Sequence, residues 1–178
     1  NAEIQIKITR AGQVVITGMA YYDDPADFVI NNYALDGLRL TQLSDEVIDQ
    51  IYDADTVIFA LGFNDSYNDD ADVFSQKINK VIEAVKKYGC KLYVNDFVWT
   101  GDAATNHYKL ELQRLAEECS GTYIDYVGEI GQEMLDAMGD WAHPSVEGHR
   151  LIAELLLSKI ELPEEGAAAD VTDSGAQA

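Results

Sequence analysis

The chain is poor in basic residues and contains no long apolar run. Its 12 lysine and arginine residues stand against 32 aspartate and glutamate residues, which gives a formal net charge of −20. Such a surface repels phosphate backbones and anionic lipids, so we expect neither nucleic acid nor a membrane as a partner. No apolar stretch approaches the ~18 residues that a membrane-spanning helix needs.

The chain is also poor in cysteine and histidine. Cys90 and Cys119 each precede a predicted strand, at the same end of the predicted sheet, so a disulfide or two free thiols would both fit. The closely spaced Cys or His pairs of a zinc site are absent. The acidic run 69–72 lacks the ligand spacing of a calcium loop and is interpreted as a solvated surface. We therefore expect no cofactor and no metal.

Hydrophobic periodicity predicts one α/β domain, in keeping with a length of 178 residues. Predicted strands lie at 14–18, 28–32, 55–61, 91–97 and 122–127. Predicted helices lie at 43–51, 74–85, 106–119 and 146–160, the second of them ended by Gly89. This alternation predicts a five-stranded, mainly parallel sheet with helices on both faces, a three-layer sandwich. Residues 4–8 alternate in hydropathy and predict an antiparallel hairpin with the strand from Gln13.

The domain is expected to span residues 3–162. Residues 163–178 are rich in alanine and polar side chains, and we interpret them as a linker-like or disordered tail that leads to possible neighbouring domains in a longer chain. An acidic domain with such a tail favours an extracellular or cell-surface protein, with the cytoplasm as the alternative.

Two polar motifs follow predicted secondary structure at chemically suggestive places. In Asp140-Trp141-Ala142-His143-Pro144, a carboxylate three residues before a histidine can hold Nδ1 of the imidazole and leave Nε2 to accept a proton. Gly62 and Asn64 follow a buried parallel strand, where open α/β sheets place their ligand sites. The Asn64 amide can donate to an oxyanion, or it can simply turn the chain and cap a helix.

A further glycine, Gly37, follows the predicted strand at 28–32, where a backbone N–H can approach a substrate closely. Taken in order, these pieces resemble the SGNH (GDSL-like) ester hydrolases over nearly the whole chain up to about Ile160. The resemblance implies a flavodoxin-like fold, with Asp140 as the triad acid and His143 as the base. It also implies that Gly37 and Asn64 bind the oxyanion. The expected substrates are acetylated carbohydrates or other small acylated molecules, as for carbohydrate esterases and lipase-like acylhydrolases.

The chain departs from this family at the nucleophile. The family's Gly-Asp-Ser should end the first strand, where this chain has Gly18-Met19-Ala20. Ala20 has no hydroxyl and cannot form an acyl-enzyme. Loss of a triad serine costs about a million-fold in turnover, so we expect hydrolysis to be impaired.

Three explanations stay open for the alanine: natural loss of the nucleophile, an engineered serine-to-alanine change, or attack by another residue. Candidates for the last are Ser66, Ser145, Tyr21 and Tyr22, although Ser66 and Ser145 are also typical of helix caps. The rival hypothesis is a non-catalytic module on the same fold that binds an acylated glycan through an aromatic rim. A purely structural or interaction domain is the third.

Overall fold

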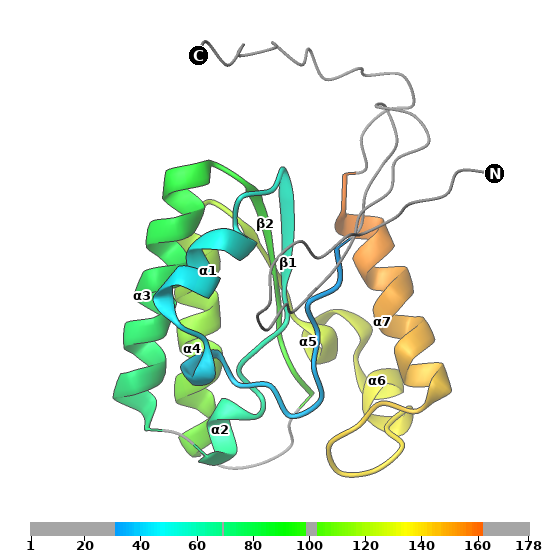
Figure 1. The fold of residues 1–178 in the computed structure, drawn as a ribbon. Coiled ribbons are helices and arrows are strands. Elements are labelled where there is room, and N and C mark those ends of the chain that lie inside the picture. Colours follow the sequence, from blue (N-terminus) through cyan, green and yellow to red (C-terminus); the bar gives the residue numbers. More distant parts are fainter. Residues whose placement is uncertain (1–30, 69, 99–102, 162–178) are drawn as a thin grey trace, which may run out of the picture. The chain divides into compact units, whose positions relative to one another are not determined.

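A computed structural model describes residues 31–68, 70–98 and 103–161 of the chain, nearly all within one compact unit that spans Tyr33–Leu162. The unit contains three strands and several helices (Figure 1). In chain order the elements are η1 (Leu40–Gln42), α1 (Asp45–Ile51), β1 (Thr56–Phe59), α2 (Asp65–Asn68), α3 (Ala71–Tyr88), β2 (Lys91–Asn95), α4 (Ala103–Glu118), β3 (Thr122–Ile124), α5 (Tyr126–Ile130), α6 (Gln132–Asp136) and α7 (Val146–Lys159).

The described strands form a parallel sheet in the order β1-β2-β3. Thr56 pairs with Lys91 at one end of the β1–β2 ladder, and Tyr93 pairs with Thr122 at the start of the β2–β3 ladder. The predicted α/β class and the parallel direction are confirmed. The strand predicted at 14–18 and the hairpin from 4–8 lie outside the described residues. The one predicted at 28–32 does so in part, and residues 31–32 have no regular secondary structure.

Helices cover both faces of this sheet (Figure 1). The alternation along β2 divides its side chains between two cores. Leu92 and Val94 pack with residues of α1, α3 and α4, whereas Tyr93 packs with Ile124 and Met134 and with partly buried residues of α7. The middle strand therefore buries both of its faces, as a parallel sheet requires.

The helix predictions hold closely. Gly89 ends α3 in the left-handed conformation, with φ of 70°, and its N–H donates to the Val85 carbonyl at 2.8 Å. Ser145 caps α7 by accepting the N–H of Gly148. Among the described residues, no helix is long and apolar enough to cross a membrane.

β2 and β3 end earlier than predicted, each directly before an aspartate that turns the chain. The Asp96 carboxylate accepts the N–H of Phe97 at 2.7 Å, which turns the chain directly after β2. Asp125 accepts the N–H of Gly128 at 2.8 Å and starts α5, so the strand predicted to reach residue 127 stops at Ile124. Asp125 acts here as an N-cap, and the alternation of apolar residues along a strand does not reveal such a cap.

Two other expectations need correction. The strand predicted at 55–61 was expected to be buried, but Ile58 of β1 is 47% exposed, on the face opposite the buried Phe59. Val146, an apolar residue at the start of the helix predicted at 146–160, is 90% exposed in the first turn of α7 and not part of the core. Cys90 and Cys119 are free thiols, and burial raises the pKa of both.

Candidate functional site

Asp140 and His143 form a hydrogen-bonded pair in the loop before α7. Nδ1 of His143 lies 2.9 Å from Oδ2 of Asp140 and 3.1 Å from its Oδ1. Both side chains reach solvent, with 74% of His143 and 51% of Asp140 exposed. The carboxylate therefore favours the tautomer with hydrogen on Nδ1 and leaves Nε2 as the proton-accepting nitrogen.

The loop that carries this pair is closed by backbone hydrogen bonds. Met138 and Pro144 form an antiparallel bridge, and the N–H of Gly139 donates to the carbonyl of His143 at 2.7 Å. Asp140 also accepts the N–H groups of Ala142 and His143 through Oδ1, each at 2.7 Å. The backbone of the turn thus holds the carboxylate next to the imidazole, in addition to the contact with the ring.

These contacts lower the pKa of Asp140 to about 2, first through the hydrogen bond from His143 and then through the N–H groups of Ala142 and His143. The carboxylate is consequently ionised throughout the neutral and mildly acidic range. An ionised acid can stabilise an imidazolium while the base holds a proton.

Gly62 and Asn64 follow β1 at its carboxyl end. Gly62 has φ of 124° and is surrounded by Phe74, Phe97 and Leu112, each about 3.5 Å or slightly more from the position of a Cβ. The Asn64 side chain donates from Nδ2 to the carbonyl of Leu38 at 3.3 Å. An amide carries two N–H hydrogens, so this bond orients the group that we expect at the oxyanion.

Asp65 ties the Gly37 segment to the end of β1, a role that the sequence analysis did not assign. Its side chain is fully buried, and its two oxygens accept the N–H groups of Leu40 at 3.1 Å and Thr41 at 3.0 Å. Gly37, with φ of 70°, lies in the turn just before these residues. The Asn64 and Asp65 contacts therefore join two of the three predicted motifs. The sequence feature that could have indicated this role is an acidic residue directly after Asn64, at the end of a buried strand.

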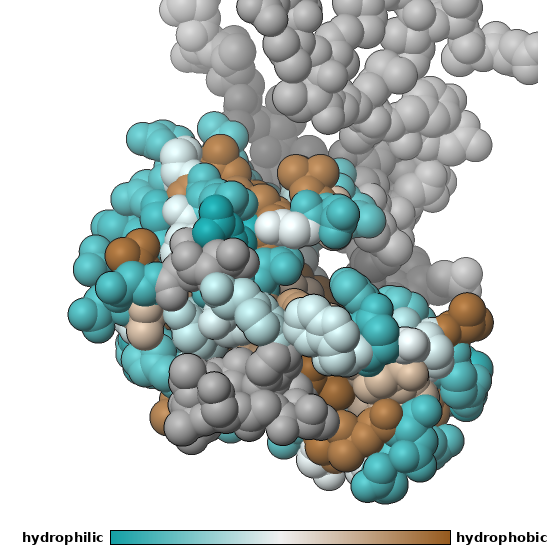
Figure 2. Space-filling model, turned by 90° about the horizontal axis from the view of Figure 1, so that it is seen from below, coloured by the Kyte–Doolittle hydropathy of each residue, from teal (hydrophilic) through white to brown (hydrophobic). Residues whose placement is uncertain are grey.

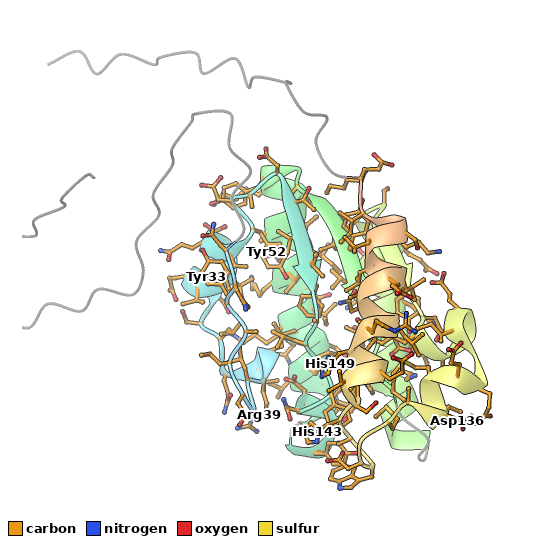
Figure 3. The ribbon with its side chains drawn as sticks, turned by 90° about the vertical axis from the view of Figure 1, so that its right-hand side faces the viewer. Tyr33, Arg39, Tyr52, Asp136, His143 and His149 are labelled. Atoms are coloured by element: carbon orange, nitrogen blue, oxygen red, sulfur yellow. The ribbon has the colours of Figure 1, made fainter. Side chains whose placement is uncertain are left out.

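An aromatic contact joins the third motif to them. The rings of Tyr67 and Trp141 meet edge to face, with centroids 5.6 Å apart. Tyr67 belongs to α2, directly after Asn64, and Trp141 lies between Asp140 and His143. Figure 3 places His143 at the same end of the unit as Arg39, a residue of the Gly37 segment. The structure thus gathers the three motifs at the end of the sheet where its strands finish.

The fourth predicted element, the Gly18-Met19-Ala20 block, lies outside the described residues, as do Tyr21 and Tyr22. The two serines considered as alternative nucleophiles have structural hydrogen bonds. Ser66 donates from Oγ to the carbonyl of Phe63 at 2.6 Å, and Ser145 caps α7. Ser145 matches the helix-cap interpretation, whereas Ser66 lies within α2 and bonds back to the turn before that helix.

A buried polar group at the end of β2 was also missed. The Asp96 side chain is 2% exposed and pairs with Lys109 of α4 at 2.8 Å. Asn95 is 5% exposed, and within the described residues its Oδ1 has no hydrogen-bond partner. Burial, followed by the Asp96 charge, raises the pKa of nearby Tyr126. Lone polar residues at a strand end carry no periodic signal, so sequence patterns do not reveal them.

A surface hollow of about 250 Å³ lies elsewhere, between α1 and α3, lined by charged residues such as Asp49 and Lys87. It contains none of the motif residues, and we give it no catalytic role.

Comparisons of the chain with protein-family models, with curated proteins and with solved structures found no match.

Proposed function

We propose that the chain is an SGNH-type ester hydrolase domain whose catalysis is impaired because Ala20 occupies the nucleophile position. The observation that carries the proposal is the contact of 2.9 Å between Nδ1 of His143 and the Asp140 carboxylate. The location of Asn64 and Gly37 at the same end of the unit supports it.

In an active relative, a serine at position 20 would attack the acyl carbon of an ester and pass its proton to Nε2 of His143. Asp140 would stabilise the imidazolium. The N–H of Gly37 and the amide of Asn64 would hold the negative oxygen of the tetrahedral intermediate, each donor contributing about 3 kcal/mol. The intermediate would then expel the alcohol, which takes the proton from Nε2. A water molecule, activated by the same imidazole, would release the acid.

The proposal includes a finer fold, in which a flavodoxin-like sheet has five strands and an antiparallel hairpin from residues 4–8. β1 supports this extension because it is the edge strand of the described sheet, where a further strand can pair.

A second candidate is a binding module for acylated glycans that uses the same loops without hydrolysis. The alanine at position 20 favours it, since His143 and Asp140 have no hydroxyl there to activate.

Hydrolysis of 4-nitrophenyl acetate by the unaltered chain and by Ala20→Ser tests the proposal. We expect the variant to exceed the unaltered chain by at least about a thousandfold, because loss of a triad serine costs about a million-fold in turnover. Adding His143→Ala to Ala20→Ser should remove the gain.

Two results would overturn the assignment. Activity already present in the unaltered chain and dependent on His143 would identify another nucleophile. Silence of a folded Ala20→Ser variant would favour the binding module.

A further inference from the structure

Two aromatic side chains reach the surface beside the Asp140–His143 pair. Trp141 is 71% exposed and Tyr67 is 43% exposed, and their ring planes meet at 75°. Figure 2 looks onto this end of the unit and shows a row of pale side chains of intermediate hydropathy, with hydrophilic and hydrophobic side chains around it. We call the pair Trp141 and Tyr67 the aromatic corner.

The aromatic corner is supported from the interior. Tyr67 packs edge to face on Phe63, with centroids 5.2 Å apart, and Phe63 packs on Phe97 with centroids 5.7 Å apart. Phe97 in turn lies close to Gly62 at the end of β1. A row of four rings therefore runs from the end of the sheet to the exposed indole. Single exposed aromatic residues are common, but these two rings contact each other, pack on interior rings and lie beside the candidate triad residues.

We propose that the aromatic corner binds the sugar ring of a neutral glycan ester and so selects the alcohol side of the substrate. The inference rests on the proposed function, because it assigns a role to the surroundings of the same imidazole. Trp141 and His143 belong to one tight loop, so a ring held against the indole lies beside the base.

The chemistry of the corner fits such a ligand. An aromatic ring offers a flat apolar body that can cover the C–H face of a pyranose. The net charge of −20 disfavours anionic ligands such as polyuronates or phosphorylated sugars. A neutral, O-acetylated oligosaccharide satisfies both conditions.

The test is an NMR titration of the unaltered chain and its variants with partially O-acetylated xylo-oligosaccharides, following the backbone N–H signals of the loop around His143, which every variant retains. We expect a saturable shift. Trp141→Ala should weaken binding by roughly three- to tenfold, the range for one lost aromatic contact, whereas Trp141→Phe should keep most of the affinity. Oligogalacturonate of the same length should bind more weakly than the neutral probe.

Tyr33→Ala is the matched control. Tyr33 is 59% exposed and lies apart from His143 in Figure 3, so its loss should leave the affinity unchanged. Equal affinity of Trp141→Ala and the unaltered chain, or no binding of the neutral probe, overturns the aromatic corner.

The ester assay with Ala20→Ser separates the two proposals. Trp141-dependent glycan binding together with a silent Ala20→Ser variant would reject the hydrolase and keep the corner. An active Ala20→Ser variant whose parent chain binds the probe independently of Trp141 would reject the corner and keep the hydrolase.

Discussion

The Asp140 carboxylate contacts both the side chain and the backbone of His143. Oδ2 lies 2.9 Å from Nδ1 of the ring, and Oδ1 accepts the backbone N–H of the same residue at 2.7 Å. One charged group therefore fixes the position of the residue and the orientation of its imidazole. Exposed pairs are usually weak, but this one is closed into a short loop.

The pKa of Asp140 should respond to His143. We expect His143→Ala to raise this pKa from about 2 toward 3.8, although not fully, because the N–H of Ala142 still donates to the carboxylate. The carboxyl carbon signal of Asp140 in an NMR pH titration reports the change. An unaltered pKa would show that the ring does not stabilise the carboxylate in solution.

The same shift has a defined sign for folding. The folded-state pKa is lowered, so the group stabilises the fold above its unfolded pKa, and this contribution is lost as the pH falls from about 4 to about 2. As the pH falls over this range, the free energy of unfolding of the unaltered chain should therefore approach that of His143→Ala.

Asp65→Ala should destabilise the protein by about 2–4 kcal/mol. The substitution leaves the N–H groups of Leu40 and Thr41 without their carboxylate acceptor at a fully buried position. Urea denaturation measures the loss. Glu117→Ala, at an exposed site on α4, is the control and should change stability by less than about 0.5 kcal/mol. Equal effects of the two substitutions would contradict the anchoring role of Asp65.

Lys109→Met should cost about 3 kcal/mol, because it leaves the Asp96 carboxylate buried at 2% exposure without its cation. Adding Asp96→Asn should recover part of the loss in a double-mutant cycle. Lys80→Met breaks the exposed pair with Glu83 and should cost about 0.5 kcal/mol or less. A Lys109 effect no larger than the Lys80 effect would show that the pair at the end of β2 is solvated.

Gly148→Ala should lower stability by about 1–3 kcal/mol and disturb the His143 loop. A Cβ at this position would lie 2.6 Å from the carbonyl oxygen of Ala137 and 2.9 Å from Cβ of Pro144. Ala137 and Pro144 belong to or flank the His143 loop, so the clash with them would disturb that loop. The cost of this clash outweighs the gain from the higher helix propensity of alanine. Thermal unfolding and the His143 ring signals check this. Leu157→Ala, at a 65% exposed site of the same helix, is the control.

The sequence predicted the parts of the fold that depend on periodicity. The apolar spacing of α3 and the left-handed glycine that ends it were recoverable because each follows a local rule. The ends of β2 and β3 were not, since the capping bonds of Asp96 and Asp125 compete with strand pairing one residue at a time.

The sequence indicated which residues form the candidate site, but not the long-range contacts that join its segments. Asp140 and His143 lie three residues apart, so the loop alone brings them into contact. The bonds from Leu40 and Thr41 to Asp65 and the ring contact of Tyr67 with Trp141 join residues far apart in the chain. Such contacts depend on tertiary packing, which short-range patterns do not encode.

Covalent labelling tests the central claim most directly. The Ala20→Ser variant would be treated with a fluorophosphonate, whose phosphorus is attacked by an activated hydroxyl with loss of fluoride, and then digested for mass spectrometry. The account predicts one adduct on the peptide that contains position 20, absent from the unaltered chain and strongly slowed by His143→Ala or Asp140→Ala. Equal labelling at position 20 with and without His143, or labelling at another residue, would contradict it.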